Sequence, residues 1–353
     1  MKKILLSVAL LATSLGFSQA LQSENFNGLT VGNLSTDITG ATAGQGSWFT
    51  LYSNGTAPTT STNAAVTNSQ VVATGHNSTN GLALVGPNGN AGSRFLWKDG
   101  LPTAWAARTT GNNVIEVEVN VNPGARGVSR NRFGVTIYNA DYLRSLVGFS
   151  VNSFTGELFL VAYATPTGQA VGNYNYSLAA APGVQLPENA WSRVGISYNF
   201  TTGQVSINST AITGGALTVA GSSANTAPAE INFAVFSGST TALPNISAGT
   251  MVFDNFTSRA IDVSNLLGTS DFVATKATVS VYPNPATDVL NVNTSNSSIT
   301  AVQIVDLNGR QVMTKSFNNV SDAQLNVNEL SAGMYLINIT SGDTVQTKKF
   351  LKQ

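Results

Sequence analysis

The amino-acid sequence predicts an all-β protein in which a large β-sandwich is followed by a small one. Thr, Ser, Asn, Gly and Val dominate the composition, and no window carries apolar residues at helical spacing beside Glu/Lys pairs. Segments of alternating polar and apolar residues recur instead, separated by turns that contain Gly or Asn. Residues 21–262 are enough for one large sandwich, and residues 278–353 for a small one.

Residues 1–20 carry the three parts of a secretory signal. Lys2 and Lys3 precede an apolar run, and Ser18 and Ala20 occupy the small positions of a signal-peptidase site. We therefore expect export, with cleavage after Ala20. The alternative, an uncleaved membrane anchor, is disfavoured because the apolar run is shorter than the ~20 residues that a membrane span needs. No later segment is apolar over that length, so no transmembrane segment is expected in the mature chain.

The region 21–262 contains two clear hairpins, which are predicted to turn at residues 152–156 and at residues 202–203. Further strands are predicted in AEINFAVFSG and GTMVFDNFTSRAI. In contrast, residues 53–70 are poor in apolar side chains and are predicted to form a long exposed loop. Strand periodicity lapses over residues 263–277, so this segment is predicted to be a linker.

The stretch VIEVEVNVNPG, residues 114–124, alternates strictly. Glu116, Glu118 and Asn120 occupy every second position, and Ile or Val fills the positions between them. This pattern predicts a half-buried strand whose apolar side faces a core and whose carboxylates face solvent. Two neighbouring carboxylates are also what a glycoside hydrolase requires, so Glu116 and Glu118 are candidate catalytic residues.

The segment 278–353 is a chain of short alternating strands. ATDVLNV, AVQIVDL, AQLNV and GMYLINI are strand candidates, while NGR and SGD are turn candidates. Pro283 and Pro285 stand at the entrance, where their missing N–H groups disturb a ladder least. The segment is therefore predicted to form a small all-β sandwich.

This segment also resembles the C-terminal sorting domain of the bacterial type IX secretion system. The matching blocks are VYPNPATDVLNV, VQIVDLNGR, LNVNELSAGMYLINI and the basic tail TKKFLKQ, in that order. The resemblance implies transport into the periplasm and then across the outer membrane, with the type IX machinery as the partner of residues 278–353. Family members generally lose this domain at the surface, where the cargo is released or anchored. The domain itself implies no catalytic residues.

The cargo region resembles the concanavalin A-like lectin/glucanase and laminin-G-like jelly rolls. ENFNGLTVGNL, VIEVEVNV, AWSRVGISYNFTTGQVSIN and VFDNFTSRA carry this likeness. It implies a jelly-roll β-sandwich over residues 21–262, and a tandem of immunoglobulin-like domains is the alternative. Sandwich glucanases of this type place three acidic residues on one strand, a pattern that falls here on Glu116, Glu118 and Asn120. Because asparagine cannot serve as the general acid, the resemblance implies an incomplete catalytic set.

Residue content excludes several kinds of site. His76 is the single histidine and there is no cysteine, which excludes disulfides and zinc sites built on two histidines. The sequence has no G-x-S-x-G elbow and no glycine-rich phosphate loop. The net charge is zero, and the arginines are scattered with a loose group at Arg126, Arg130 and Arg132, so no nucleic-acid partner is expected.

Carbohydrate binding needs aromatic faces and a few fixed hydrogen-bonding groups, but little charge. The segment SRFLWKDGLPTAWAAR supplies four candidate ligand-binding residues, namely Trp97, Trp105, Arg94 and Asp99. The competing interpretation is that tryptophans in a β-sandwich belong to its core. Trp191, which opens the second hairpin, is the clearest core candidate.

A structural calcium ion is implied by the resemblance, because related sandwiches bind one near the pairing of their first and last strands. The candidate ligands here are Glu24 and Asp254. Calcium takes six to eight oxygen ligands, and the sequence offers two or three at this place. The alternative is that these carboxylates cap turns. No other cofactor is expected.

These observations predict a secreted or cell-surface protein that is not catalytic and that binds polysaccharides or surface glycans, or acts in adhesion. The alternative is a glycoside hydrolase of the glucanase type that uses Glu116 and Glu118. In that case the general acid would have to come from another strand.

Overall fold

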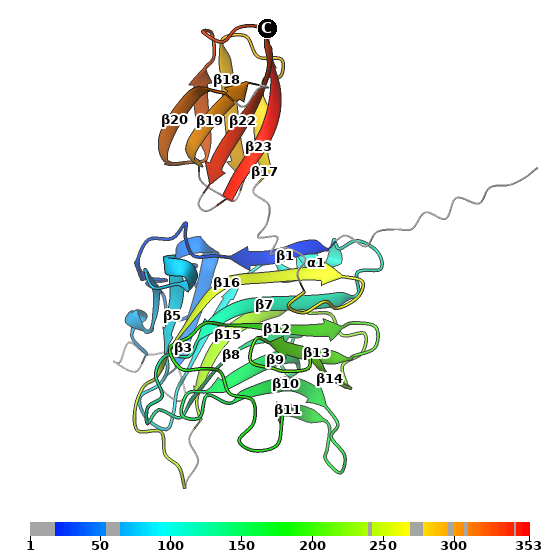
Figure 1. The fold of residues 1–353 in the computed structure, drawn as a ribbon. Helices are drawn as coiled ribbons and strands as arrows, with labels where there is room; N and C mark the ends of the chain where they lie inside the picture. Colours follow the sequence, from blue (N-terminus) through cyan, green and yellow to red (C-terminus); the bar gives the residue numbers. More distant parts are fainter. Residues whose placement is uncertain are drawn as a thin grey trace, which may run out of the picture.

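The computed structural model describes residues 18–53, 64–238, 242–268, 278–295, 299–306, 310–341 and 344–353. Within these ranges the chain forms two β-sandwiches, each with its own hydrophobic core (Figure 1). The predicted all-β class is confirmed. Among the described residues, no helix has the length and apolar character needed to cross a membrane.

One layer of the large sandwich is a nine-stranded sheet with the order β14-β13-β12-β7-β16-β5-β4-β2, and β1 pairs with β16. The pairs in this sheet are antiparallel. Its strands are β1 (Gln19–Glu24), β2 (Gly32–Asn33), β4 (Ser69–Val72), β5 (Gly81–Val85), β7 (Val114–Asn122), β12 (Ser192–Asn199), β13 (Val205–Ser209), β14 (Leu217–Val219) and β16 (Thr250–Ile261).

The second layer is a seven-stranded antiparallel sheet with the order β11-β10-β9-β8-β15-β6-β3 (Figure 1). Its strands are β3 (Trp48–Ser53), β6 (Ser93–Lys98), β8 (Asn131–Tyr138), β9 (Ser145–Asn152), β10 (Leu158–Ala164), β11 (Gly172–Ser177) and β15 (Glu230–Ser237). The short helices are α1 (Leu101–Ala106) and the 3₁₀ turns η1 (Gln45–Ser47), η3 (Val66–Asn68) and η4 (His76–Ser78).

Aromatic side chains fill the space between the two layers. Phe233 from the seven-stranded sheet meets Phe253 and Phe256 from the nine-stranded sheet edge-to-face, with ring centroids 5.3 and 5.2 Å apart. Trp48 packs against the same Phe233 at 5.3 Å. Edge-to-face contacts of this kind add to the stabilisation from area burial, so this cluster holds the two layers together.

Both predicted hairpins are present, as β9–β10 and β12–β13. The exposed-loop prediction for residues 53–70 is wrong at its end, because Ser69 and Gln70 belong to β4 and Ser69 is buried. The hydroxyl of Tyr52 hydrogen-bonds the Ser69 hydroxyl, which ties β4 to the core. Residues 54–63 of that prediction lie outside the described residues.

At the N-terminal end, the structure places Gln19 and Ala20 in β1, opposite Ala260 and Arg259 of β16. Cleavage after Ala20 would therefore remove two residues of this strand. Residues 1–17, which hold most of the predicted secretory signal, lie outside the described residues.

The small sandwich consists of a three-stranded sheet, β17-β18-β21, and a four-stranded sheet, β20-β19-β22-β23. Its strands are β17 (Thr278–Tyr282), β18 (Val289–Ser295), β19 (Ile299–Asp306), β20 (Gln311–Val320), β21 (Asp322–Asn326), β22 (Gly333–Ser341) and β23 (Thr344–Lys352). Leu290, Ile304, Ile337 and Phe350 are among its buried core residues. The turns predicted at NGR and SGD fall largely at residues 307–309 and 342–343, outside the described residues.

Candidate functional site

The alternating stretch in β7 forms the predicted strand, but both of its faces are buried. Glu116 and Glu118 are only 1% and 3% exposed. The expectation that these carboxylates face solvent is wrong. Burying two like charges on one strand would be strongly unfavourable without cations beside them, and the neighbouring strands supply these cations.

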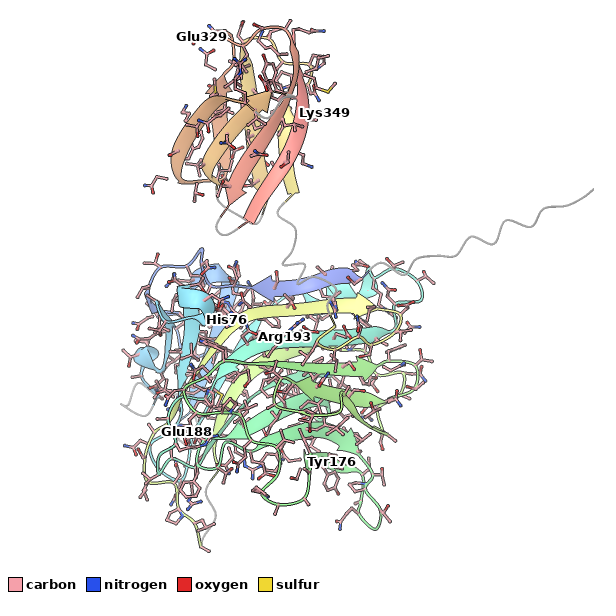
Figure 2. All side chains as sticks on the ribbon, viewed as in Figure 1. His76, Tyr176, Glu188, Arg193, Glu329 and Lys349 are labelled. Carbon is pink, nitrogen blue, oxygen red and sulfur yellow. The ribbon has the colours of Figure 1, made fainter. Side chains whose placement is uncertain are left out.

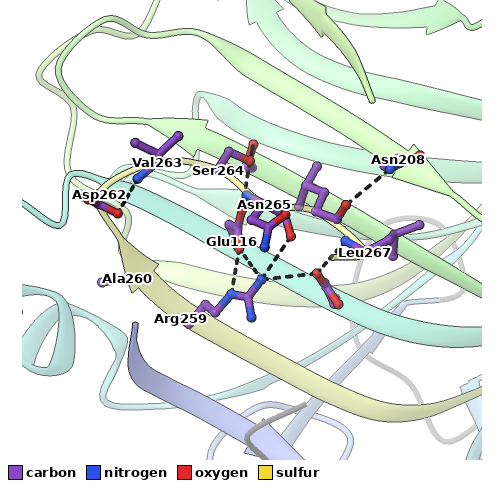
Figure 3. A network of polar contacts seen from close by, with 12 residues as sticks. Glu116, Asn208, Arg259, Ala260, Asp262, Val263, Ser264, Asn265 and Leu267 are labelled. Atoms are coloured by element: carbon purple, nitrogen blue, oxygen red, sulfur yellow. Dashed lines mark hydrogen bonds and ion pairs between the residues drawn. The ribbon is translucent and has the colours of Figure 1, made fainter. Parts of the chain in front are cut away.

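Arginines from the two strands that flank β7 neutralise this pair of carboxylates. Arg259 on β16 lies directly opposite Glu116, and its Nε donates to Glu116 Oε2 at 2.6 Å (Figure 3). Its Nη2 also reaches Glu118 Oε1 at 3.5 Å. Arg193, which is labelled in Figure 2, lies on β12 and donates to the second oxygen, Oε2, of Glu118. Each carboxylate therefore has a cationic partner.

The segment that follows β16 covers the same carboxylates. The Ser264 hydroxyl, at 2.8 Å, and the Asn265 N–H donate to Glu116 Oε1, and the Leu267 N–H donates to Glu118 Oε1 at 3.0 Å (Figure 3). Residues 264–267 were predicted to belong to the linker, yet they are fixed on the nine-stranded sheet. Since Glu116 is enclosed by protein groups, it has no contact with solvent through which a polysaccharide could reach it.

Two of the four predicted ligand-binding residues are also buried. Arg94 is 0% exposed and lies on the inward side of β6, where its guanidinium stands 5.6 Å from the ring centroid of Tyr52. Burial lowers the pKa of Arg94 to about 10. Trp105 in α1 is buried against Phe200, and the guanidinium of Arg108 lies 4.0 Å from its ring centroid. Neither Arg94 nor Trp105 can contact a ligand on the surface.

The two predicted calcium ligands each accept hydrogen bonds from protein groups. Glu24 forms an ion pair with Lys98 at 3.0 Å. Asp254 Oδ2 accepts from the His76 N–H at 2.7 Å and from the Thr79 hydroxyl at 3.1 Å. Among the residues that the structure describes, no three His, Cys, Asp or Glu side chains form a cluster that could hold a metal ion. The calcium site stays a prediction.

The other two predicted residues, Trp97 and Asp99, lie on the outer side of the seven-stranded sheet, which is called the open face here. On β8, the odd positions from Phe133 to Ile137 belong to the core, so the even positions from Arg132 to Tyr138 lie on the open face. Phe236 on this face is 40% exposed.

Small residues form the middle of the open face. Gly134 on β8 pairs with Ser150 of β9 on one side and with Ala234 of β15 on the other. Thr136 pairs with Gly148 in the next row. A Cβ atom on Gly134 would lie 2.0 Å from a backbone carbonyl oxygen, so no larger residue fits there without a shift of the backbone. The middle of the face therefore carries small residues.

Aromatic side chains stand on both sides of these small residues. On the β3–β6 side, Trp97 stacks on Phe49 with ring centroids 5.6 Å apart and an interplanar angle of 14°. Phe95 meets Phe236 edge-to-face at 5.2 Å. On the opposite side, the alternation of β10 places Phe159 on the same face, opposite Ser150. These small residues therefore lie between aromatic side chains.

A polar cluster occupies one end of the open face, centred on Glu230. The Tyr142 hydroxyl donates to Glu230 Oε2 at 3.0 Å, and Asn232 Nδ2 donates to Glu230 Oε1 at 2.7 Å. Asp99 accepts a hydrogen bond from Trp97 Nε1 at 3.2 Å. The antiparallel pairing of β6 with β15 brings both carboxylates to the same end of the face.

Burial raises the pKa of Glu230. The nearby charge of Asp99 raises it further, whereas the hydrogen bonds from Tyr142 and Asn232 lower it in part. Burial and the charge of Glu230 likewise raise the pKa of Tyr142. Glu230 thus keeps its proton to a higher pH than an ordinary glutamate does, while its carboxyl group lies on a face that solvent can reach.

One hydrogen-bonding atom of this cluster has no partner within the described part of the chain. Asn232 is 4% exposed, and its Oδ1 accepts no hydrogen bond although its Nδ2 is held by Glu230. A buried acceptor without a donor is destabilising, so this atom lowers the stability of the sheet at this end of the face. Glu230, Asn232 and Tyr142 were not among the predicted site residues, although the alternation of AEINFAVFSG already places Glu230 and Asn232 on one face.

Replacing Arg259 with Met would leave Glu116 charged and buried without its main cation. We expect the free energy of unfolding of the large sandwich to fall by about 3–5 kcal/mol, which is typical when one partner of a buried ion pair is removed. Guanidinium unfolding followed by tryptophan fluorescence measures this loss, because Trp48, Trp97, Trp105 and Trp191 all lie in this sandwich.

Adding Glu116→Gln to Arg259→Met removes the unpaired charge and should restore part of the lost stability. Arg132→Met is the matched control, since the Arg132 guanidinium stacks 5.1 Å from the Phe159 ring centroid and has no ion pair among the described residues. We expect it to cost no more than about 1 kcal/mol. Equal losses in the Arg259 and Arg132 variants would contradict the role of the buried network.

The raised pKa of Glu230 predicts a pH-dependent contribution to stability. Because the folded protein disfavours the ionised carboxylate, the stabilisation is fully present below the pKa of the unfolded chain and is lost as the pH rises through the folded pKa. We expect the stability of the wild-type protein to fall relative to Glu230→Gln between pH 4 and pH 7. Chemical unfolding of both proteins at the two pH values, with Glu188→Gln as a control for charge removal, measures the difference. If the stability of the wild-type protein increased relative to Glu230→Gln as the pH rises, the prediction would be wrong.

Comparison with known proteins identifies the small sandwich. Residues 280–353 match the family described as secretion system C-terminal sorting domain. A curated relative, ulvan lyase NLR42 of Nonlabens ulvanivorans, is 38% identical over 74 residues, which cover 20% of this chain. The match spans only 14% of the length of that relative.

Solved structures similar to the chain include three with TM-scores of 0.38. Alginate lyase vAL-1 from Chlorella virus is 12% identical, over 61% of this chain and 93% of that chain. The alginate lyase Aly36B mutant in complex with alginate tetrasaccharide is 14% identical, over 69% and 98%. The CBM2 module of the evolved Dit of Lactobacillus casei BL23 phage J-1 is 13% identical, over 71% and 99%.

The sorting-domain match and the two separate cores together give the organisation of the chain. The large sandwich is the cargo, and the C-terminal sorting domain marks it for type IX secretion, to the cell surface or to the medium.

Proposed function

We propose that the cargo sandwich binds a polysaccharide on its open face. The observation that carries this proposal is the Trp97–Phe49 stack, which lies on the same face as the polar cluster of Glu230 and Tyr142. A sugar ring placed on Trp97 would present hydroxyl groups beside its aromatic contact. These hydroxyl groups would lie beside Asp99 and the polar cluster of Glu230 and Tyr142.

The chemistry of the face suits a carbohydrate better than an apolar ligand. Sugar-binding sites combine aromatic faces, which pack on the C–H side of a ring, with a few fixed polar groups that determine orientation. Here Glu230 holds the Asn232 side chain, and Asp99 holds the indole N–H of Trp97. Because these groups are fixed before binding, little conformational entropy is lost when the ligand arrives.

The small residues in the middle of the face support a chain-like ligand. Gly134, Gly148 and Ala234 lie on three neighbouring strands, and aromatic residues stand on both sides of them. Export by the type IX route brings the cargo to the compartment in which extracellular polysaccharides occur. A purely adhesive role without a sugar ligand stays the competing interpretation of the low charge of the chain.

Hydrolysis on the same face is the second candidate function, and the raised pKa of Glu230 favours it. In this reaction the neutral carboxyl of Glu230 would give its proton to the glycosidic oxygen as the C–O bond breaks. The carboxylate of Asp99 would take a proton from the water that attacks the sugar carbon. This assignment replaces Glu116, which is buried beneath residues 264–267.

Removing the aromatic platform should weaken binding. We expect Trp97→Ala to raise the Kd for a bound polysaccharide at least roughly tenfold, a change of about 1.4 kcal/mol, while Trp97→Phe keeps most of the affinity because it can still stack. A glycan array identifies the ligand, and affinity electrophoresis or calorimetry of the purified protein gives the Kd.

Trp191→Ala is the matched control, because Trp191 lies against His76 and outside the open face. Its Kd should equal that of the wild-type protein once unfolding curves show that both are folded. Failure of the wild-type protein to bind any polysaccharide on the array would refute the proposal. Equal weakening by Trp97→Ala and Trp191→Ala would refute the assignment to this face.

The hydrolase candidate predicts release of reducing ends from a polysaccharide that the protein binds. Glu230→Gln should lower the rate at least roughly hundredfold, the smallest effect usual for loss of a general acid, and should leave the polysaccharide bound. The exposed Glu188→Gln serves as the matched control and should keep the full rate. The hydrolase candidate would be refuted if Glu230→Gln released reducing ends as fast as the wild-type protein, or if the wild-type protein released none. The open face would then be a binding site only.

A further inference from the structure

Two arginines lie on the open face at the end opposite the Glu230 cluster. Arg132 on β8 pairs with Phe236 of β15, whereas Tyr138 at the other end of β8 pairs with Glu230. Arg130 lies just before β8, two residues from Arg132, and its guanidinium stacks on Phe154, which lies between β9 and β10. Six residues of strand separate Arg132 from Tyr138, which corresponds to about 20 Å.

Both guanidinium groups stack on aromatic rings. Arg130 lies 4.3 Å from the ring centroid of Phe154, and Arg132 lies 5.1 Å from that of Phe159. Among the described residues, neither guanidinium has an ion pair or a hydrogen-bond acceptor, and both side chains are partly exposed.

The remaining arginines of the cargo sandwich differ in this respect. Arg193 and Arg259 are paired with buried carboxylates. The other four arginines donate hydrogen bonds to backbone carbonyls or to a hydroxyl group, namely Arg94, Arg108, Arg126 and Arg144. As far as the described residues go, Arg130 and Arg132 thus keep their hydrogen-bond donors for a group that comes from outside.

Guanidinium chemistry indicates which group this is. A planar guanidinium donates two parallel hydrogen bonds to a carboxylate or a sulfate, and stacking on an aromatic ring fixes its plane in advance. A neutral sugar hydroxyl does not need two such donors side by side. At the other end of the face, the carboxylate of Asp99, joined by Glu230 when it is ionised, would repel an anionic group, so the two ends favour different parts of a ligand.

We propose that the ligand is an anionic polysaccharide whose carboxylate or sulfate groups are bound by Arg130 and Arg132. This inference rests on the proposed polysaccharide binding by the open face. It adds the chemical class of the ligand and the orientation of the polysaccharide along the face. The charged groups lie at the arginine end, and hydroxyl groups of neighbouring sugars lie at the Trp97 and Asn232 end.

The test compares polymers that differ mainly in charge. Calorimetric titration of the purified protein uses polygalacturonate against its methyl ester for carboxylates, and carrageenan against agarose for sulfates. We expect at least tenfold tighter binding to the charged member of one pair, and weaker binding of that polymer as NaCl is raised from 0.05 to 0.5 M. The pair that shows the preference identifies the anionic group.

The variant Arg130→Gln/Arg132→Gln should lose at least tenfold in affinity for the charged polymer and should bind the uncharged one as the wild-type protein does. Arg310→Gln/Lys349→Gln is the matched control, because it removes two positive charges from exposed positions of the sorting domain and should change nothing.

The outcomes separate this inference from the proposal on which it rests. Equal binding of charged and uncharged polymers, binding of neutral polymers alone, or unchanged affinity in the arginine variant overturns the anionic ligand and leaves polysaccharide binding in place. No binding of any polymer by the wild-type protein overturns both.

Discussion

Two buried carboxylates in the middle of the nine-stranded sheet determine which face of the cargo sandwich remains accessible. Glu116 and Glu118 are stable there only because Arg259 and Arg193 neutralise them and because backbone N–H groups of residues 264–267 satisfy their remaining lone pairs. These requirements bring a whole segment across the outer side of the sheet. The opposite sheet carries no such charges at the middle of its outer side, where Gly134, Gly148 and Ala234 lie, and it stays open.

Strand alternation predicts which residues share a side, but it does not predict what covers that side. Glu116 in VIEVEVNV and Glu230 in AEINFAVF have the same local pattern, yet one is enclosed and the other lies on the accessible face. The groups that enclose Glu116 come from positions 143 to 149 residues later in the chain. Such long-range partners leave no periodic signal near the strand, so an active-site interpretation of Glu116 was as compatible with the sequence as the structural role that it has.

Strand alternation and long-range packing also explain which of the predicted binding residues are accessible. In SRFLWKD the residues Phe95, Trp97 and Asp99 alternate onto the open face, whereas Arg94 and Leu96 point into the core. Strict use of this alternation would have separated Trp97 and Asp99 from Arg94. Trp105 lies in a six-residue helix that strand periodicity does not reveal, and its burial depends on Phe200 from a distant turn. The all-β class, both hairpins and the sorting domain were predictable because their signals are local.

For ligand recognition by the open face, the positions of the charged groups matter more than their number. A chain with a net charge of zero has no long-range field to attract a ligand, so recognition depends on groups that act at contact distance. At one end the open face has guanidinium groups with no ion pair among the described residues, and at the other end it has acidic side chains, with small residues between them. A ligand that spans this distance meets attraction at one end and repulsion at the other, which distinguishes its two directions. The stacked rings of Phe154 and Phe159 hold the arginines in place before binding, so this discrimination requires little rearrangement of the protein.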